Sequence, residues 1–176
     1  MDLMRYLGQQ RIIFIGDRIT DAVANNVVAQ LLAMEVADPD AEISIYINSG
    51  GGIPYAVNAI LDTMAISKCP LSTVALGACM SQSTLVLAAG TKGRRFSMPN
   101  ARIMMHQPQG GAMGTIHDVK IQAVELNRTM KVVQQMFADY TGMPLEKVEE
   151  ETDRDRFLTP QQAVELGIID GVIDSA

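Results

Sequence analysis

The sequence has few of the residues that build metal centres and disulfide frameworks. Its 176 residues include only two cysteines, Cys69 and Cys79, and two histidines, His106 and His117. Neither cysteine belongs to a metal-ligand spacing, so we expect no metal site. Two cysteines in a chain of this length also exclude a disulfide framework. We therefore interpret both thiols as small buried residues in a reducing compartment.

The sequence also lacks a membrane span, a basic charge balance and a nucleotide-binding motif. No apolar run reaches the roughly 18–20 residues that a transmembrane helix needs, and the first residues have neither a signal-peptide nor a transit-peptide composition. The net charge of −6 disfavours a nucleic-acid partner, because a phosphate backbone would be repelled. Neither the G-x-G-x-x-G nor the Walker pattern occurs, which excludes the common phosphate-binding loops.

Apolar residues, in contrast, are abundant. They make up 48% of the chain and include twelve methionines. This content is high for a soluble monomer, so we expect part of the apolar surface to pack against other subunits. The length fits one domain, which we take to be residues 1–176.

Strand and helix patterns alternate along the first hundred residues. Glu42–Ser49 has an apolar residue at every second position, as a strand does, whereas the segment before it has apolar residues at helical spacing. We expect strands at residues 11–16, 42–49, 71–77 and 101–106, and helices at residues 20–38, 54–67 and 81–90. This order predicts an α/β domain of repeated βαβ units with mostly parallel strands.

One long helix is expected over Thr115–Tyr140, which contains no proline or glycine. A helix of that length extends about 39 Å, more than a domain this small can cover, so we expect it to project into a partner subunit. Towards the C-terminus, Thr159 and Pro160 begin a short helix that Gly167 ends. Residues 168–173 are expected to close the chain as a strand.

Three small polar side chains, Cys79, Ser81 and Ser83, lie in one apolar run. A buried hydroxyl without a partner costs roughly 1–3 kcal/mol, so the run suggests a turn with a polar task. If Ser81 is a nucleophile, it needs a base, which is usually a histidine held by a carboxylate. His117 has charged neighbours near the start of the long helix. His106 ends a strand, where side chains from parallel strands converge, and is the better candidate, with a structural role still open.

The residues alone do not define the other groups that such a site needs. Spacing does not select one carboxylate among several candidates, which include Asp62, Asp118, Asp153, Asp155 and Asp170. Three glycines, at positions 50, 51 and 52, follow a strand and can bring backbone N–H groups close to a developing oxyanion. They also fit a plain tight turn. The absence of a G-x-S-x-G motif around Ser81 disfavours an α/β-hydrolase.

Three segments carry a resemblance to the proteolytic subunit of the Clp protease, and the resemblance covers nearly the whole chain from about Asp2. They read YINSGGG, GACMSQSTLVLAAGTKGRRFSMPNARIMMHQPQGG and DRDRFLTPQQAVELGIIDGVID. By this resemblance, Ser81 is the nucleophile, His106 is the general base and Asp155 orients His106. Backbone N–H groups of Gly52 and Gln82 would form the oxyanion hole.

The resemblance also implies a fold and an assembly. The fold is the α/β fold that Clp proteolytic subunits share with crotonase-like proteins, with a ring-forming head and a handle at about residues 108–141. Two stacked seven-membered rings, a tetradecamer of identical or paralogous subunits, would enclose the active sites. Asp153 and Arg154 match positions of ion pairs between the rings, and the segment QPQGGAMG, residues 107–114, matches the mobile strand of the handle.

The same resemblance implies the partners and the compartment. Substrates would be unfolded polypeptides, fed through an axial pore by a hexameric AAA+ Clp unfoldase. ATP is used by that unfoldase, so we expect no cofactor on this chain. The expected compartment is the cytoplasm of a bacterium, or the plastid stroma or mitochondrial matrix for an organelle protein whose presequence has been removed.

Three residues depart from the family pattern. Gly50 stands where the family usually has proline, and Pro54 falls in the segment that pairs with a bound peptide, where it has no N–H to donate. Gln82 replaces an apolar residue after the nucleophile but keeps its backbone N–H. These departures leave open a structural or weakly active paralogue subunit of a heteromeric ring. A third reading is a hydratase or isomerase on the crotonase fold, which would use oxyanion donors without a Ser-His-Asp set.

Overall fold

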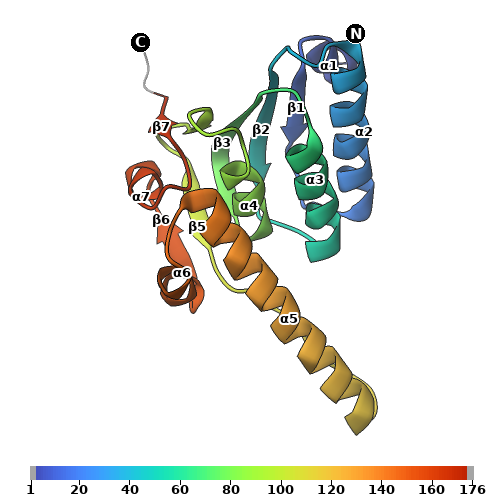
Figure 1. The fold of residues 1–176 in the computed structure, drawn as a ribbon, viewed down its shortest axis with the longest axis vertical. Coiled ribbons are helices and arrows are strands. Elements are labelled where there is room, and N and C mark those ends of the chain that lie inside the picture. The colour runs from blue at the N-terminus through green and yellow to red at the C-terminus, as the bar shows by residue number, and fades with distance from the viewer. Residues whose placement is uncertain (1–2, 174–176) are drawn as a thin grey trace.

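Parallel strands form the centre of the molecule, and helices pack on them (Figure 1). The computed structural model describes residues 3–173, so both ends of the predicted domain lie outside the described residues. Within that range the strands are β1 (Ile12–Ile15), β2 (Ile43–Ser49), β3 (Leu71–Met80), β4 (Arg95–Ser97), β5 (Arg102–Met105), β6 (Arg156–Leu158) and β7 (Gly171–Val172).

These strands form one sheet in the order β1-β2-β3-β4-β7, and β5 joins the far end of β3 and carries β6. Between the described strands, only the β5–β6 pair is antiparallel. The predicted α/β domain with mostly parallel strands is therefore confirmed. β3 runs on past Gly77, where a strand end was expected, because that glycine takes a φ of 48° and bends the strand without ending it.

The helices of the described residues are α1 (Leu3–Gln9), α2 (Asp21–Ala37), α3 (Pro54–Ile66), α4 (Gln82–Ala88), α5 (Ile116–Thr141), α6 (Leu145–Thr152) and α7 (Pro160–Glu165). Every expected helix is present within a few residues of its predicted bounds. The sequence analysis did not identify α1, α6, β4 or β6. The two strands have three residues each, too few for alternation to be visible.

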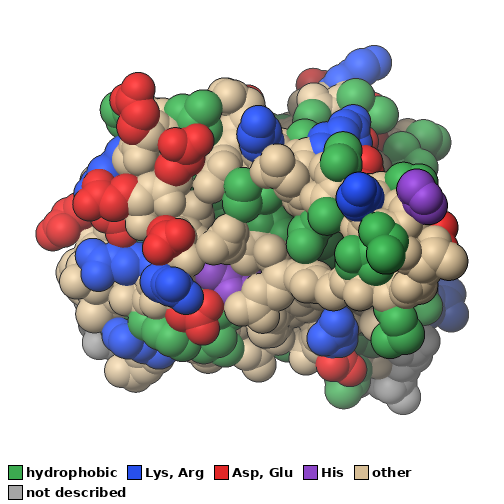
Figure 2. Space-filling model, turned by 90° about the horizontal axis from the view of Figure 1, so that it is seen from below, with side chains coloured by type: hydrophobic (Ala, Val, Ile, Leu, Met, Phe, Trp, Pro, Cys, Tyr) green, Lys and Arg blue, Asp and Glu red, His purple; other side chains and the backbone are tan. Residues whose placement is uncertain are grey.

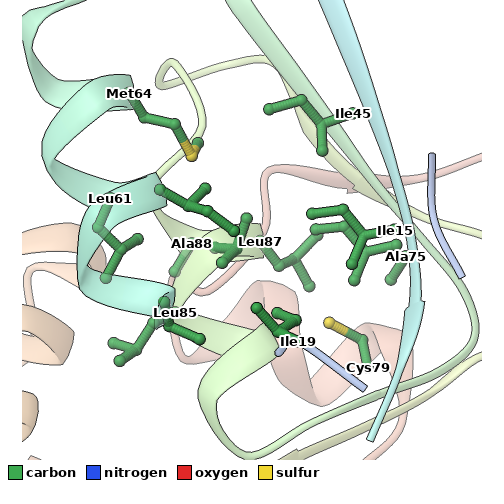
Figure 3. Close-up of a cluster of buried hydrophobic side chains, with 14 of the residues drawn as sticks. Ile15, Ile19, Ile45, Leu61, Met64, Ala75, Cys79, Leu85, Leu87 and Ala88 are labelled. Carbon is green, nitrogen blue, oxygen red and sulfur yellow. The ribbon is translucent and has the colours of Figure 1, made fainter. Parts of the chain in front are cut away.

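The hydrophobic core lies between the sheet and helices α2, α3 and α4. The alternating isoleucines of β2, at positions 43, 45 and 47, are fully buried. Figure 3 shows Ile45 across from Met64 of α3, with Leu87 of α4 lying between the helices and the strands. Complete burial of each such side chain contributes about 1.5–3 kcal/mol. This packing fixes the end of β3 and the start of α4, and thus the turn between them.

The long helix α5 projects from the body of the molecule, as predicted (Figure 1). Thr115 and Asp118 form a capping box at its start, and Gly142 ends it in the left-handed conformation with a φ of 80°. Ile116, Ile121 and other apolar residues on it are exposed. The partner subunit expected there stays a prediction. None of the helices in residues 3–173 is both long and apolar enough to cross a membrane.

The segment before α5 has no strand, although the resemblance implies one at residues 107–114. Among the described residues, no backbone pairs with this segment in a β ladder. The side chain of Gln122 instead holds both backbone groups of Met113, accepting from its N–H at 3.1 Å and donating to its oxygen at 3.0 Å. A strand here would need a neighbour from outside the chain.

A nearly buried ion pair joins β4 to the segment before β7. The guanidinium of Arg95, 3% exposed, donates from Nη2 to Asp170 Oδ1 at 2.7 Å and from Nε to Oδ2 at 2.9 Å. Arg95 also donates to the backbone oxygens of Ala88 and Tyr140, which end α4 and lie near the end of α5. The hydrogen bonds from Arg95 hold the pKa of Asp170 below its ordinary value of 3.8.

We expect Asp170→Asn to lower the free energy of unfolding by about 3 kcal/mol at pH 7, because it leaves a buried guanidinium without its counterion. The carboxylate has a lower pKa folded than unfolded, so its contribution is present above the unfolded pKa and is lost as the pH falls through the folded value. Urea unfolding at pH 7 and at successively lower pH values measures this, with the exposed Asp40→Asn as the control. A difference from wild type that does not shrink as the pH falls would contradict the assignment.

Candidate active site

Ser81 occupies the turn between β3 and α4 in a strained backbone conformation. Its φ is 58° and its ψ is −128°, a region that residues other than glycine rarely adopt and that costs about 1–3 kcal/mol. The Ser81 N–H donates to the oxygen of Met104 in β5 at 2.9 Å, which helps to hold the turn in place. Such strain is commonly found at functional sites, because the surrounding fold must supply the energy that maintains it.

Strand pairing brings His106 and Asp155 to this turn. β5 runs parallel to the end of β3, with Met80 opposite Met104, so His106 emerges beside Ser81. β6 runs antiparallel to β5, with Arg156 opposite Met105, so the residue before it, Asp155, emerges beside His106. His106 Nε2 lies 2.7 Å from Ser81 Oγ, and His106 Nδ1 lies 3.0 Å from Asp155 Oδ1.

This chain of hydrogen bonds has a definite chemical direction. A carboxylate can only accept, so Asp155 holds the proton of the neutral imidazole on Nδ1 and leaves the lone pair of Nε2 facing Ser81 Oγ. His106 is mostly buried, whereas Asp155 is about half exposed. The arrangement can withdraw the hydroxyl proton as the serine oxygen attacks an electrophile.

The other candidates lie elsewhere. His117 is exposed on the first turn of α5. Asp118 caps that helix, and its hydrogen bonds from Thr115 lower its pKa. Asp170 pairs with Arg95. The carboxylate that spacing could not select is therefore identified by geometry, because in the described residues only Asp155 bonds to the imidazole of His106.

The glycines after β2 pack directly against the Ser81 turn. Gly51 has a φ of 102°, and a Cβ on it would lie 2.9 Å from Ser81 Cβ. A Cβ on Gly52 would lie 2.1 Å from the backbone oxygen of Ile19, so a side chain is excluded there too. Gly50 has open space around it and no positive φ, so the departure from the family's proline falls where the fold does not require glycine.

Within residues 3–173, two backbone N–H groups of the segments that meet at the Ser81 turn have no acceptor. Ile19 and Gly52 form an isolated parallel β-bridge. In it, the oxygen of Ile19 accepts from the N–H of Ile53, and the N–H of Ile19 donates to the oxygen of Gly51. The N–H of Gly52 itself takes no part in these hydrogen bonds. Among the described residues, no acceptor reaches the N–H of Gly52 or that of Gln82, the first residue of α4. Unpaired N–H groups beside a nucleophile can stabilise an oxyanion.

The sequence analysis gave no specific role to the two hydroxyl residues that follow Gln82. Ser83 accepts a hydrogen bond from the N–H of Met80 at 2.9 Å. Thr84 Oγ1 donates to the oxygen of Met104 in β5 at 2.7 Å. The available signal was the occurrence of three hydroxyl residues within four positions of a buried run, SQST, which is more than packing requires.

The interpretation of the cysteines as small buried residues is confirmed, since both are buried and free. Burial raises the pKa of the Cys79 thiol to about 12. The thiol therefore stays protonated at neutral pH and is no competing nucleophile. Within residues 3–173, no three His, Cys, Asp or Glu side chains gather as a metal ion would require. The expectation that no metal is bound stays a prediction.

A cleft opens at His106 and is lined by residues of three segments, His106–Gly110, Leu126 and Asp153–Asp155. Figure 2 views this end of the molecule, where acidic and basic side chains gather around a histidine. Asp153 and Arg154 are strongly exposed and pair with each other at 3.6 Å. Both are accessible to another subunit, and their role between rings stays a prediction.

Pro54, expected in a segment that pairs with a bound peptide, is the first residue of α3. The N–H of a first helical residue has no partner within its helix, so proline costs α3 no hydrogen bond. With Pro108 and Leu126, Pro54 lines a second hollow that adjoins the cleft. Its side chain thus contributes apolar surface beside the site.

Comparison with known proteins gives one family. A protein-family model described as Clp protease matches residues 1–176.

Proposed function

The chain belongs to the Clp protease family, and from this premise we propose that it hydrolyses peptide bonds of unfolded polypeptides as a serine peptidase. Membership of the family confirms the resemblance predicted from the sequence motifs. The observation that carries the proposal is the continuous relay from Ser81 Oγ through His106 to Asp155, with contacts of 2.7 and 3.0 Å. A relay of this kind activates a serine hydroxyl that is otherwise inert at neutral pH.

The reaction proceeds in two stages. His106 Nε2 takes the proton of Ser81 as Oγ forms a bond to the scissile carbonyl carbon, and the carbonyl oxygen becomes an oxyanion. The N–H groups of Gly52 and Gln82 donate to that oxyanion. His106 then protonates the leaving amine as the carbon–nitrogen bond breaks, which leaves an acyl-enzyme on Ser81. Water, deprotonated by His106, releases the second product by the same steps.

The proposed assembly has two stacked seven-membered rings of identical or paralogous subunits. The exposed apolar residues of α5 and the exposed ion pair of Asp153 and Arg154 support it, since both surfaces lie where another subunit can reach them. The proposed partner is a hexameric AAA+ Clp unfoldase, which uses ATP and feeds the chamber, so this chain needs no cofactor. The proposed compartments are the bacterial cytoplasm, the plastid stroma or the mitochondrial matrix.

Two other functions, a structural subunit and a crotonase-like hydratase or isomerase, are less well supported. Neither gives a task to the hydrogen-bonded Ser81, His106 and Asp155, and neither explains the strained backbone of Ser81. The departures from the family pattern at Gly50 and Pro54 do not disturb the fold. Gly50 lies in open space, and Pro54 begins α3, where its missing N–H would have no partner within the helix.

The test of the proposed function is covalent labelling of the purified chain with a fluorophosphonate probe. We expect stoichiometric modification at Ser81, located by mass spectrometry, in a particle whose sedimentation corresponds to the stacked rings. A well-formed ring that stays unlabelled would contradict the peptidase function and support a structural subunit. Modification at another serine would contradict the assignment of Ser81.

A further inference from the structure

We propose that Ser83 is a positioning residue for the oxyanion hole. Its hydroxyl joins the turn that carries Ser81 and Gln82 to the glycine loop, which we define as Ser49–Gly52. The two expected oxyanion donors lie on these two separate segments, so their spacing depends on what holds the segments together. This inference rests on the proposed function and adds a residue to its machinery.

Ser83 makes its contacts with both segments from a fully buried position. The N–H of Met80, the residue before the nucleophile, donates to Ser83 Oγ at 2.9 Å. The hydroxyl proton of Ser83 can be donated across to the oxygen of Ser49 at 2.8 Å, or back to the oxygen of Met80 at 2.7 Å. The contact with Ser49 spans 34 positions in the sequence and connects the nucleophile turn to the start of the glycine loop.

The hydrogen-bond ladder between β2 and β3 is interrupted just before the glycine loop. The side chain of Ser83 therefore matters more for holding the loop in place. Pairing between β2 and β3 is continuous up to Ile47, then shifts in register, and resumes only with Ser49 opposite Cys79. The bend at Gly77 lies within that shift. Within the shift the side chain of Asn48 accepts from the N–H of Ala78 at 3.1 Å, and at the start of the glycine loop the hydroxyl of Ser83 adds a further connection to the one described backbone pair.

The connection continues from Ser49 to the donors. Ser49 Oγ accepts from the N–H of Gly51 at 3.2 Å. An ideal Cβ on Gly51 would lie 3.2 Å from the backbone nitrogen of Gln82, so the loop is packed on the nitrogen of the second donor. A small shift of the loop changes the distance between the N–H groups of Gly52 and Gln82. Preorganised donors of this kind lose effect when displaced by a fraction of an ångström to an ångström.

The experiment compares wild type with Ser83→Ala in the assembled, full-length chain. We expect the rate of fluorophosphonate labelling and the kcat for a short fluorogenic peptide to fall about 10-fold to 100-fold, with KM changed less than about twofold. Affinity for a peptide boronate, whose tetrahedral adduct places an oxygen in the oxyanion hole, should fall by the same factor. A residue that only filled space would not produce this split between kcat and KM.

Ser97→Ala is the matched control, because Ser97 is also fully buried but, among the described residues, its hydroxyl donates only to the neighbouring Met98 oxygen. Its kcat should stay within about twofold of wild type even if its melting temperature falls. Ser83→Cys, assayed in reducing buffer, keeps a side chain of similar size with a weaker donor and should be intermediate. If Ser83→Ala does not fold, the kcat of Ser83→Cys tests the positioning role in its place.

The outcomes separate this inference from the proposed function. A wild-type protein labelled at Ser81, with Ser83→Ala equally reactive, overturns the positioning role and leaves the peptidase intact. An equal loss of kcat in Ser97→Ala also overturns it. A wild-type ring that is not labelled overturns the proposed function and this inference with it.

Discussion

Replacing Ser81 with alanine is expected to abolish cleavage of a short fluorogenic peptide, with a loss in kcat of about 10⁴-fold or more. The change removes the only oxygen that the described relay presents to a substrate, since His106 Nε2 lies 2.7 Å from Ser81 Oγ and faces no other described hydroxyl. Catalysis by water alone, assisted by the oxyanion donors, is slower by that order. The measurement is the steady-state rate of the purified variant, with fluorophosphonate labelling in parallel.

Assembly provides the control for Ser81→Ala. The hydroxyl makes its described hydrogen bond to His106 and takes no part in the core, so folding and sedimentation should equal those of wild type. Peptide cleavage that persists in pure variant protein would show that Ser81 is not the nucleophile. Lost cleavage together with lost assembly would mean that the residue is structural.

Asp155→Asn is expected to lower kcat by about 10⁴-fold while KM changes little. The carboxylate of Asp155 accepts from His106 Nδ1 at 3.0 Å and thereby keeps the lone pair of Nε2 towards Ser81. Asparagine can present its amide N–H instead, which favours the opposite tautomer and places a proton between imidazole and hydroxyl. Both kcat and the labelling rate of Ser81 measure the effect.

Asp40→Asn is the control for Asp155→Asn. It removes the same charge from an exposed side chain before β2, which has no described contact with His106. In preparations of equal ring content, its labelling rate should stay within about twofold of wild type. If Asp155→Asn retained more than a tenth of wild-type kcat, another group would have to orient His106.

The fold was largely predictable, because its signals are local. Alternating isoleucines of β2 and the spacing of apolar residues in α2 and α3 agree with the sides that become buried. The capping box of Thr115 and the left-handed Gly142 bound α5 within two residues of its predicted ends. Short elements such as β4 and β6 were missed, since three residues carry no period and their pairing depends on distant strands.

The site was only partly predictable. Reasoning from residue chemistry put Ser81 and His106 forward as a possible nucleophile and base, but their roles, and the preference for Asp155 over Asp170, came from the family resemblance. Nothing in the sequence makes Asp170 a weaker candidate than Asp155 for the carboxylate that orients His106. Only the structure shows that Asp170 pairs with Arg95. The role of Ser83 could not be predicted from the sequence either. Its hydroxyl bonds to the oxygen of Ser49, a backbone atom that no pattern of side chains reveals.

The sequence by itself determined the parallel α/β domain and the long α5, and it limited the candidate bases to two histidines, since periodicity, capping and the scarcity of histidine are all properties of neighbouring residues or of composition. The tertiary structure decided which carboxylate meets His106 and what holds the glycine loop against Ser81. Both depend on the register of strands that are far apart in the chain, β3 with β5, β5 with β6 and β2 with β3. Register is set by the packing of the whole sheet, because a slip of one residue would turn every side chain to the opposite face.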